Sequence, residues 1–249
     1  MVLKSRREGR VLVLTIDRPE AHNALDREVL SGLDRALDQA ERDPAIRVVA
    51  ITGQPGVFCS GADLAGGAEE TPEESARLYF RTLRRFTTSS CIIVSVVDGT
   101  VQAGGIGLVA ASDYVVCSES STFRLPEVLL GLIPACVLPF LIRRVGVHTS
   151  QMLALTAQKL DARRAAELRL VDQVAPDLTD ALRRFILGVE RIPEDAVSTL
   201  KHYVHQLAPI SDRDEELAIA QIVALMSRPK SLDVVHELVA HGIWPERSK

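Results

Sequence analysis

The sequence predicts an α/β domain followed by a helical C-terminal region. Short apolar, β-branched runs alternate with amphipathic helical patterns through the first half of the 249 residues, and after about residue 138 the pattern is almost wholly helical. With 47% hydrophobic residues, the chain can bury one large core. We therefore expect an α/β core over residues 1–190 and a helical region over residues 191–249.

The elements follow from local patterns. Strands are predicted where short apolar runs end at turn-forming residues, over residues 11–16, 48–52, 92–97 and 114–117. Helices are predicted where apolar residues recur at spacings of three and four, over residues 26–41, 75–88, 183–189, 195–207, 214–226 and 231–240. Asp26 is the expected cap of the first helix. The amphipathic C-terminal helices have apolar faces to bury, which favours an oligomer.

Composition excludes several classes of protein. The net charge is −4 and no block of the sequence forms a basic face, so no nucleic-acid partner is expected. No apolar run approaches the roughly 18 residues of a membrane span, and the first ten residues are too polar for a signal peptide. The four cysteines show no C-x-x-C spacing. We expect a cytoplasmic protein with reduced thiols and no membrane contact.

Two glycine-containing turns are the main candidates for chemistry. One spans residues 58–64 after a predicted strand, and the other contains Gly104 and Gly105 before a predicted helix. Glycines at a helix start leave backbone N–H groups free at its positive end, and two such groups aimed at one carbonyl oxygen form an oxyanion hole. The glycine pair could equally be a packing feature. Phosphate binding has no support, since neither G-x-G-x-x-G nor a Walker pattern is present.

Several motifs in order resemble the crotonase superfamily of enoyl-CoA hydratases and isomerases, and together they span most of the chain. They lie at residues 17–25, which look like the family's adenine and pantetheine loop, and at residues 61–63, 98–99, 103–105, 126–127, 131–134 and 165–172. The resemblance implies a crotonase fold, a spiral of ββα repeats with a C-terminal helical trimerisation region. It also implies a homotrimer or a dimer of trimers.

The same resemblance implies the site residues. The oxyanion donors would be the backbone N–H groups of Ala62 and Gly104. Enoyl-CoA hydratases use two glutamates; the first falls at Gly107 and is absent here, whereas the second aligns with Glu127. The alternative for Glu127 is a helix-entry glutamate satisfied by local N–H groups. The expected substrate contacts are Ala24, Gly105, Tyr79, Arg81 and Pro134. Tyr79 could instead fill the core side of its helix.

Residues 103–113 and 129–146 resemble one subgroup, the first enoyl-CoA-hydratase-like enzyme of polyketide β-branching cassettes. This subgroup also has glycine in place of the first glutamate. The resemblance implies dehydration of 3-hydroxy-3-methylglutaryl on an acyl carrier protein to 3-methylglutaconyl-carrier protein. Double-bond isomerisation, decarboxylation and non-catalytic binding of an acyl thioester are the alternatives. The substrate would arrive on phosphopantetheine of the carrier protein or on CoA, and no further cofactor is expected.

Such a substrate has a distal carboxylate, which needs a cation where it loses water. Arg77, Arg81 and Arg84 share one face of the predicted helix 75–88, and Arg124 is a second candidate. A solvated helix face, or a steering surface for an acidic carrier protein, would explain the same arginines. His202 and His205 lack acidic or cysteine partners, so no metal site is predicted. A further hypothesis is that His241 and Trp244 cap the pocket, as family tails often do.

Overall fold

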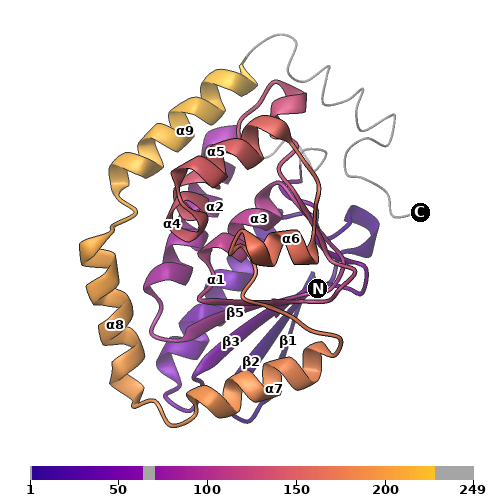
Figure 1. The fold of residues 1–249 in the computed structure, drawn as a ribbon. Helices are drawn as coiled ribbons and strands as arrows, with labels where there is room; N and C mark the ends of the chain where they lie inside the picture. Colours follow the sequence, from indigo (N-terminus) through magenta and orange to yellow (C-terminus); the bar gives the residue numbers. More distant parts are fainter. Residues whose placement is uncertain (1, 64–70, 228–249) are drawn as a thin grey trace.

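The computed structural model describes residues 2–63 and 71–227, which form two β-sheets surrounded by helices (Figure 1). The strand order is β1-β2-β3-β5-β7-β10 in the first sheet and β4-β6-β8-β9 in the second. The strands are β1 (Leu3–Glu8), β2 (Val11–Ile16), β3 (Val48–Thr52), β4 (Val57–Cys59), β5 (Ile92–Val97), β6 (Thr100–Gln102), β7 (Tyr114–Cys117), β8 (Thr122–Arg124), β9 (Leu160–Asp161) and β10 (Gln173–Val174). The mixed α/β class is confirmed.

The helices pack around these sheets, and α7 covers one face of the first sheet (Figure 1). They are α1 (Arg27–Arg42), α2 (Pro72–Thr88), α3 (Gly104–Ala111), α4 (Leu138–Val145), α5 (Val147–Thr156), α6 (Ala162–Glu167), α7 (Leu178–Val189), α8 (Glu194–Leu207) and α9 (Asp212–Met226), with 3-10 turns η1 (Pro19–Ala21) and η2 (Glu127–Leu130). Within the described ranges, no helix is long and apolar enough to cross a bilayer.

Both faces of the first sheet are buried from β2 to β7, whereas β1 is largely exposed. β1 pairs antiparallel with β2, and the later strands pair in parallel. Leu12 and Leu14 of β2 face the main core, while the alternate residue Val11 faces the apolar side of α7, which includes Phe185. Parallel strands covered on both sides form near-continuous apolar runs. For this reason the sequence predicts β2, β3, β5 and β7 with the bounds observed.

The second sheet has much shorter strands. β4, β6 and β8 pair in parallel, and β9 pairs antiparallel with β8. Each of these strands has two or three residues, which is too short for an apolar alternation to stand out in the sequence. No sequence pattern therefore predicts this sheet, although the ββα spiral implied by the resemblance requires one.

Capping residues explain where two helices begin. Asp26 accepts a hydrogen bond from the Val29 amide at 2.8 Å, which confirms it as the cap of α1. α2 begins at Pro72, three residues before the predicted start at Ser75, because Thr71 and Glu74 form a reciprocal capping box. The predicted helix over residues 231–240 lies outside the described residues.

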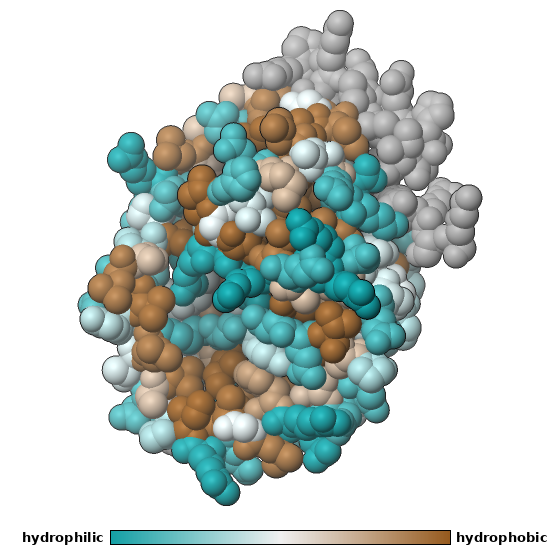
Figure 2. Space-filling model, viewed as in Figure 1, coloured by the Kyte–Doolittle hydropathy of each residue, from teal (hydrophilic) through white to brown (hydrophobic). Residues whose placement is uncertain are grey.

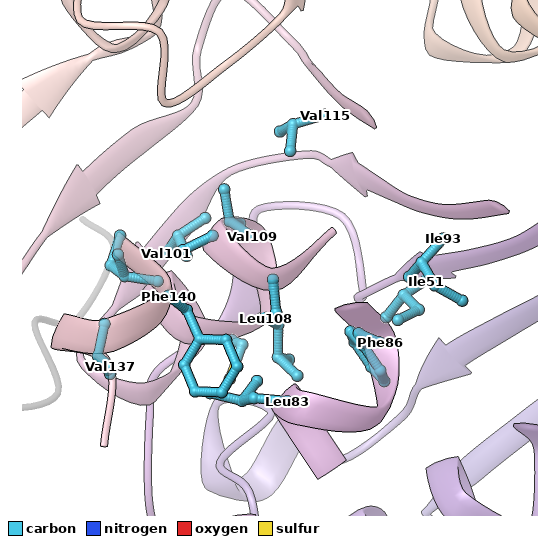
Figure 3. Packing of buried hydrophobic residues seen from close by; sticks show 14 of the residues in the cluster. Ile51, Leu83, Phe86, Ile93, Val101, Leu108, Val109, Val115, Val137 and Phe140 are labelled. Carbon is cyan, nitrogen blue, oxygen red and sulfur yellow. The ribbon is translucent and has the colours of Figure 1, made fainter. Parts of the chain in front are cut away.

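The core fixes α2, α3 and α4 against one another. Leu83 of α2, Leu108 of α3 and Phe140 of α4 are fully buried and lie together in one apolar cluster (Figure 3). The rings of Phe80 and Phe140 meet edge to face, with centroids 5.2 Å apart. Close packing of this kind leaves little freedom for one helix to shift along another.

An ion-pair cluster joins α9 to α2. Glu215 of α9 is only 2% exposed. Its carboxylate pairs with Arg77 at 3.2 Å, with Arg81 at 2.9 Å and with Arg84 at 3.0 Å. Helices α8 and α9 both pack on α2 of the α/β core. The division of the chain at residue 190 into a core and a helical region stays a prediction.

Candidate active site

The groups expected to carry chemistry follow three neighbouring strands of the second sheet. Ala62 follows β4, Gly104 follows β6, and Glu127 follows β8. Since β4, β6 and β8 are parallel neighbours, their carboxyl ends lie at one edge of the sheet. In α/β proteins, ligands bind beyond the carboxyl ends of parallel strands. The sheet therefore brings the three predicted catalytic residues to one place.

The amides of Ala62 and Gly104 are free to bind a ligand. The Leu25 amide donates to the Gly61 carbonyl at 2.7 Å, and the Asp63 amide donates to the Leu25 carbonyl at 3.0 Å. This parallel bridge uses the residues on either side of Ala62, so its own N–H points away from Leu25. Gly104 is the first residue of α3. Neither amide donates a hydrogen bond within residues 2–63 and 71–227.

The two amides lie close together because Gly61 has no side chain. Gly61 has φ +105°, and a Cβ there would lie 2.7 Å from the Ala103 Cβ and 3.1 Å from the Gly104 nitrogen. A Cβ added to Gly104 would lie 3.5 Å from the Ala62 nitrogen. Both N–H groups therefore border one small space at the positive end of α3, as an oxyanion hole requires.

Ala103 makes the sharp turn between β6 and α3. Its φ of 47° and ψ of −120° are rare for a residue with a side chain and cost about 1–3 kcal/mol. The Ala103 amide donates to the Arg124 carbonyl at 3.0 Å, which ties the turn to β8. Ala103 also packs with Leu130 of η2. The turns that carry Gly104 and Glu127 are thus in contact.

Arg18 clamps the loop that precedes α1 to the turn after β4, a role that no motif in the sequence predicts. Its guanidinium donates to the Ala24 carbonyl at 2.6 Å and pairs with Asp63 at 2.9 Å and Asp26 at 3.2 Å. The predicted substrate contact Ala24 is therefore buried beside this clamp. The only sequence signal was the position of Arg18 inside the motif over residues 17–25.

Glu127 is a buried carboxylate with an unpaired oxygen. The residue is 8% exposed, and its Oε2 has no hydrogen-bond partner within the described part of the chain. Burial raises the pKa of Glu127 to about 7, against a smaller lowering by its own backbone amide. A carboxyl group with such a pKa is present in both protonation states near neutral pH. It can therefore accept a proton in one step and return it in another.

Tyr79 lies near both Glu127 and Gly104, whose amide is one of the pair. Its hydroxyl donates to the Gly104 carbonyl at 2.5 Å. Burial raises the pKa of Tyr79 well above 10, and the neighbouring Cys136, Cys59 and Glu127 raise it further. The hydroxyl therefore stays protonated at neutral pH. Tyr79 therefore lies beside the site, and its contact with the substrate stays a prediction.

The other predicted contacts occupy different surroundings. A Cβ on Gly105 would lie 2.7 Å from the Cys59 carbonyl, so this glycine permits α3 to pack closely on β4. Pro134 lines an apolar groove of about 260 Å³ on the outer side of η2, together with Val128 and Ile133. Gly105 and Pro134 stay predicted substrate contacts.

The arginines considered for a distal carboxylate already have partners. The Arg81 side chain is 58% exposed and donates to Glu215 through Nε at 2.9 Å. Arg77 and Arg84 also pair with Glu215, and Arg124 donates to the Ala157 carbonyl at 2.9 Å. The common face of α2 is thus directed toward α9.

The remaining candidates add no further group to the site. The ring of His202 lies 3.1 Å from the Gln206 amide, and no group of three or more His, Cys, Asp or Glu suited to a metal ion occurs among the residues described. His241 and Trp244 lie outside the described residues.

The fold, the paired amides and the buried carboxylate of Glu127 define a protein of the crotonase class. The model of the family described as "Enoyl-CoA hydratase/isomerase" matches residues 6–234 of this chain. The chain therefore belongs to the enoyl-CoA hydratase/isomerase family, and the predictions of a crotonase fold and of a hydro-lyase are confirmed at that level.

Individual relatives are similar over most of the chain. The bacillaene synthase dehydratase PksH of Bacillus subtilis is 29% identical over 248 residues, covering 98% of this chain and 95% of that protein. The 2,3-dehydroadipyl-CoA hydratase of Escherichia coli is 35% identical, covering 70% and 69%. The crystal structure of the polyketide biosynthesis enoyl-CoA hydratase pksH from Bacillus subtilis superposes with a TM-score of 0.88 at 27% identity, covering 100% and 99%.

The buried carboxylate predicts a pH-dependent stability. The pKa of Glu127 in the folded protein is raised from 4.5 to about 7, so the folded state loses stability as the pH rises between these values. Glu127→Gln cannot ionise and avoids this loss. We expect the free energy of unfolding of Glu127→Gln, relative to that of the unsubstituted protein, to rise by about 3 kcal/mol between pH 4.5 and 8.

Guanidinium unfolding at several pH values measures this difference. Glu119→Gln, which changes an exposed carboxylate, is the matched control. A difference for Glu127→Gln that stays constant across the pH range would show that Glu127 has an ordinary pKa.

The oxyanion hole predicts a selective defect for Gly104→Ala. The added methyl group meets its neighbours at 3.5 Å, which is ordinary contact, so the variant should fold. The same methyl group crowds the space beside the Ala62 amide. We expect kcat/KM for an acyl thioester to fall by about 10²–10³ while the melting temperature changes little.

Gly188→Ala serves as the control, because a Cβ at this position of α7 meets nothing within 4 Å. Unchanged turnover by a folded Gly104→Ala variant would contradict the assignment of the oxyanion hole.

Proposed function

We propose that this chain dehydrates 3-hydroxy-3-methylglutaryl, or a close analogue, on an acyl carrier protein to the 3-methylglutaconyl product. The observation that carries the proposal is the unpaired, buried Oε2 of Glu127 at the sheet edge that also presents the free amides of Ala62 and Gly104. Position 107, where hydratases have the first of their two glutamates, is a glycine. One carboxylate and one oxyanion hole are sufficient for a syn elimination.

In the proposed reaction, Glu127 and the amides of Ala62 and Gly104 account for every proton and every charge. The Glu127 carboxylate removes the α-proton, and the electrons of that C–H bond move into the thioester, whose oxygen becomes negative. The N–H groups of Ala62 and Gly104 stabilise this charge. The enolate then collapses, the C2=C3 double bond forms, and the 3-hydroxyl leaves. Protonated Glu127 delivers its proton to that hydroxyl, which gives water and restores the carboxylate.

The similarity to PksH supports the choice of substrate class. That relative is a polyketide dehydratase, and its similarity extends along 98% of this chain. Enoyl-CoA hydratases of the same family act on acyl thioesters, so carrier-protein and CoA thioesters are the proposed partners. Arg81 is the proposed cation for the distal carboxylate, because its ion pair with Glu215 uses Nε and its side chain is 58% exposed.

Mass spectrometry of the acyl-carrier protein tests the proposal. Incubation of 3-hydroxy-3-methylglutaryl-carrier protein with the chain should give a loss of water. Further loss of carbon dioxide would add a decarboxylase activity, and no change would refute dehydration and call for an isomerisation assay with an enoyl thioester. Glu127→Gln should lower turnover by at least about 10² and still bind the substrate, because only the proton-transfer group is lost.

Glu119→Gln again supplies the control, since it changes an exposed carboxylate. Near-normal dehydration by Glu127→Gln would refute the single-carboxylate mechanism.

We further propose that the chain assembles as a homotrimer or a dimer of trimers. Leu200, Tyr203 and Leu207 are exposed at spacings of three and four on α8, and hydrophobic side chains gather along this edge of the molecule (Figure 2). Multi-angle light scattering of the full chain should give three or six times 27.2 kDa. A monomer at micromolar concentration would contradict this proposal.

A further inference from the structure

The side chain of Tyr79 occupies the space beside Gly107. A Cβ added to Gly107 would lie 1.9 Å from the Tyr79 hydroxyl oxygen and 3.1 Å from its Cζ. It would also lie 2.9 Å from the end of the Leu83 side chain. Carbon and oxygen atoms that are not bonded do not approach to 1.9 Å, so no side chain fits at position 107 while Tyr79 stays in place.

A hydrogen bond and the packing of the surrounding core hold Tyr79 in place. Its hydroxyl donates to the Gly104 carbonyl at 2.5 Å, one turn before Gly107 on α3. The helices that carry the two residues are fixed by the buried side chains Leu83 and Leu108, which lie in the same cluster (Figure 3). Tyr79 therefore cannot make room without breaking a hydrogen bond and disturbing the core.

We propose that Tyr79 is a specificity-determining residue that occupies the volume of the missing first glutamate and so limits the site to one-carboxylate chemistry. The inference rests on the proposed function, in which Glu127 acts alone. Hydration of an enoyl thioester needs a second group to hold a water molecule and accept its proton. With Tyr79 beside Gly107, no carboxylate at that position can face Glu127.

Tyr79 replaces the volume of that carboxylate but not its chemistry. Burial raises the pKa of Tyr79 well above 10, so the hydroxyl keeps its proton. That proton is directed to the Gly104 carbonyl. A protonated phenol engaged in this way cannot accept a proton from water. It does support the residue whose amide forms part of the oxyanion hole.

Four proteins test the proposal: the unsubstituted chain, Gly107→Glu, Tyr79→Ala and the double variant. Crotonyl-CoA is the probe, and hydration is followed by the loss of enoyl-thioester absorbance. In the double variant the carboxylate introduced at position 107 accepts a proton from water, the water oxygen bonds to C3, and Glu127 supplies the proton to C2. We expect the double variant to hydrate at least about 10-fold faster than either single variant.

Tyr114→Ala combined with Gly107→Glu is the matched control. Tyr114 is also half-buried and hydrogen-bonded, but its hydroxyl contacts Gln173 between β7 and β10. Deleting this ring should not permit hydration. A folded double variant at positions 79 and 107 without hydration, or hydration by Gly107→Glu alone, would overturn the proposal.

Melting temperatures decide the question if the glutamate variants do not fold. Gly107→Ala should lower the melting temperature of the unsubstituted protein and have a much smaller effect in the Tyr79→Ala background. Additive shifts would overturn the proposal, and non-additive shifts support it. Neither measurement uses the carrier-protein substrate, so failure of the proposed dehydration would be seen separately.

Discussion

The parallel pairing of β4, β6 and β8 is the constraint on which the rest of the site depends. Each strand has only three residues, and each ends just before a functional group: the Ala62 amide, the Gly104 amide or the Glu127 carboxylate. Hydrogen bonds between neighbouring strands set the separation of these groups before any substrate binds. Preorganised dipoles of this kind need little reorganisation as charge develops, which is the main advantage of an oxyanion hole.

Holding the groups in this arrangement has a local energetic cost. Ala103 adopts a positive φ, and Glu127 is buried with an unpaired oxygen. Each feature destabilises the fold by about 1–3 kcal/mol. The surrounding structure offsets these costs through the core around Phe140 and through the ion pairs of Arg18. Both Ala103 and Glu127 lie in the active site, where Ala103 serves the geometry and Glu127 the proton transfer.

The sequence predicts the larger elements well and the site only in part. β2, β3, β5 and β7 are predictable because burial on both faces makes each of them an apolar run. The second sheet could not be predicted from sequence patterns, because strands of two or three residues are too short to show an alternation of apolar and polar side chains. Ala62, Gly104 and Glu127 came from the order of motifs. The contact between Tyr79 and Gly107 could not be predicted, because it depends on how α2 packs on α3, for which residue spacing gives no information.

The contact between Tyr79 and Gly107 also has a consequence for descent within the family. An ancestor with a glutamate at position 107 could not have acquired this tyrosine first, because the two side chains overlap. In a lineage with that ancestor, the glutamate must be lost before Tyr79 arrives or together with its arrival. With the Tyr79 ring in place, a single substitution of Gly107 by glutamate is blocked by steric overlap. Tyr79 and Gly107 are therefore coupled: the residue that one position can accept depends on the residue at the other.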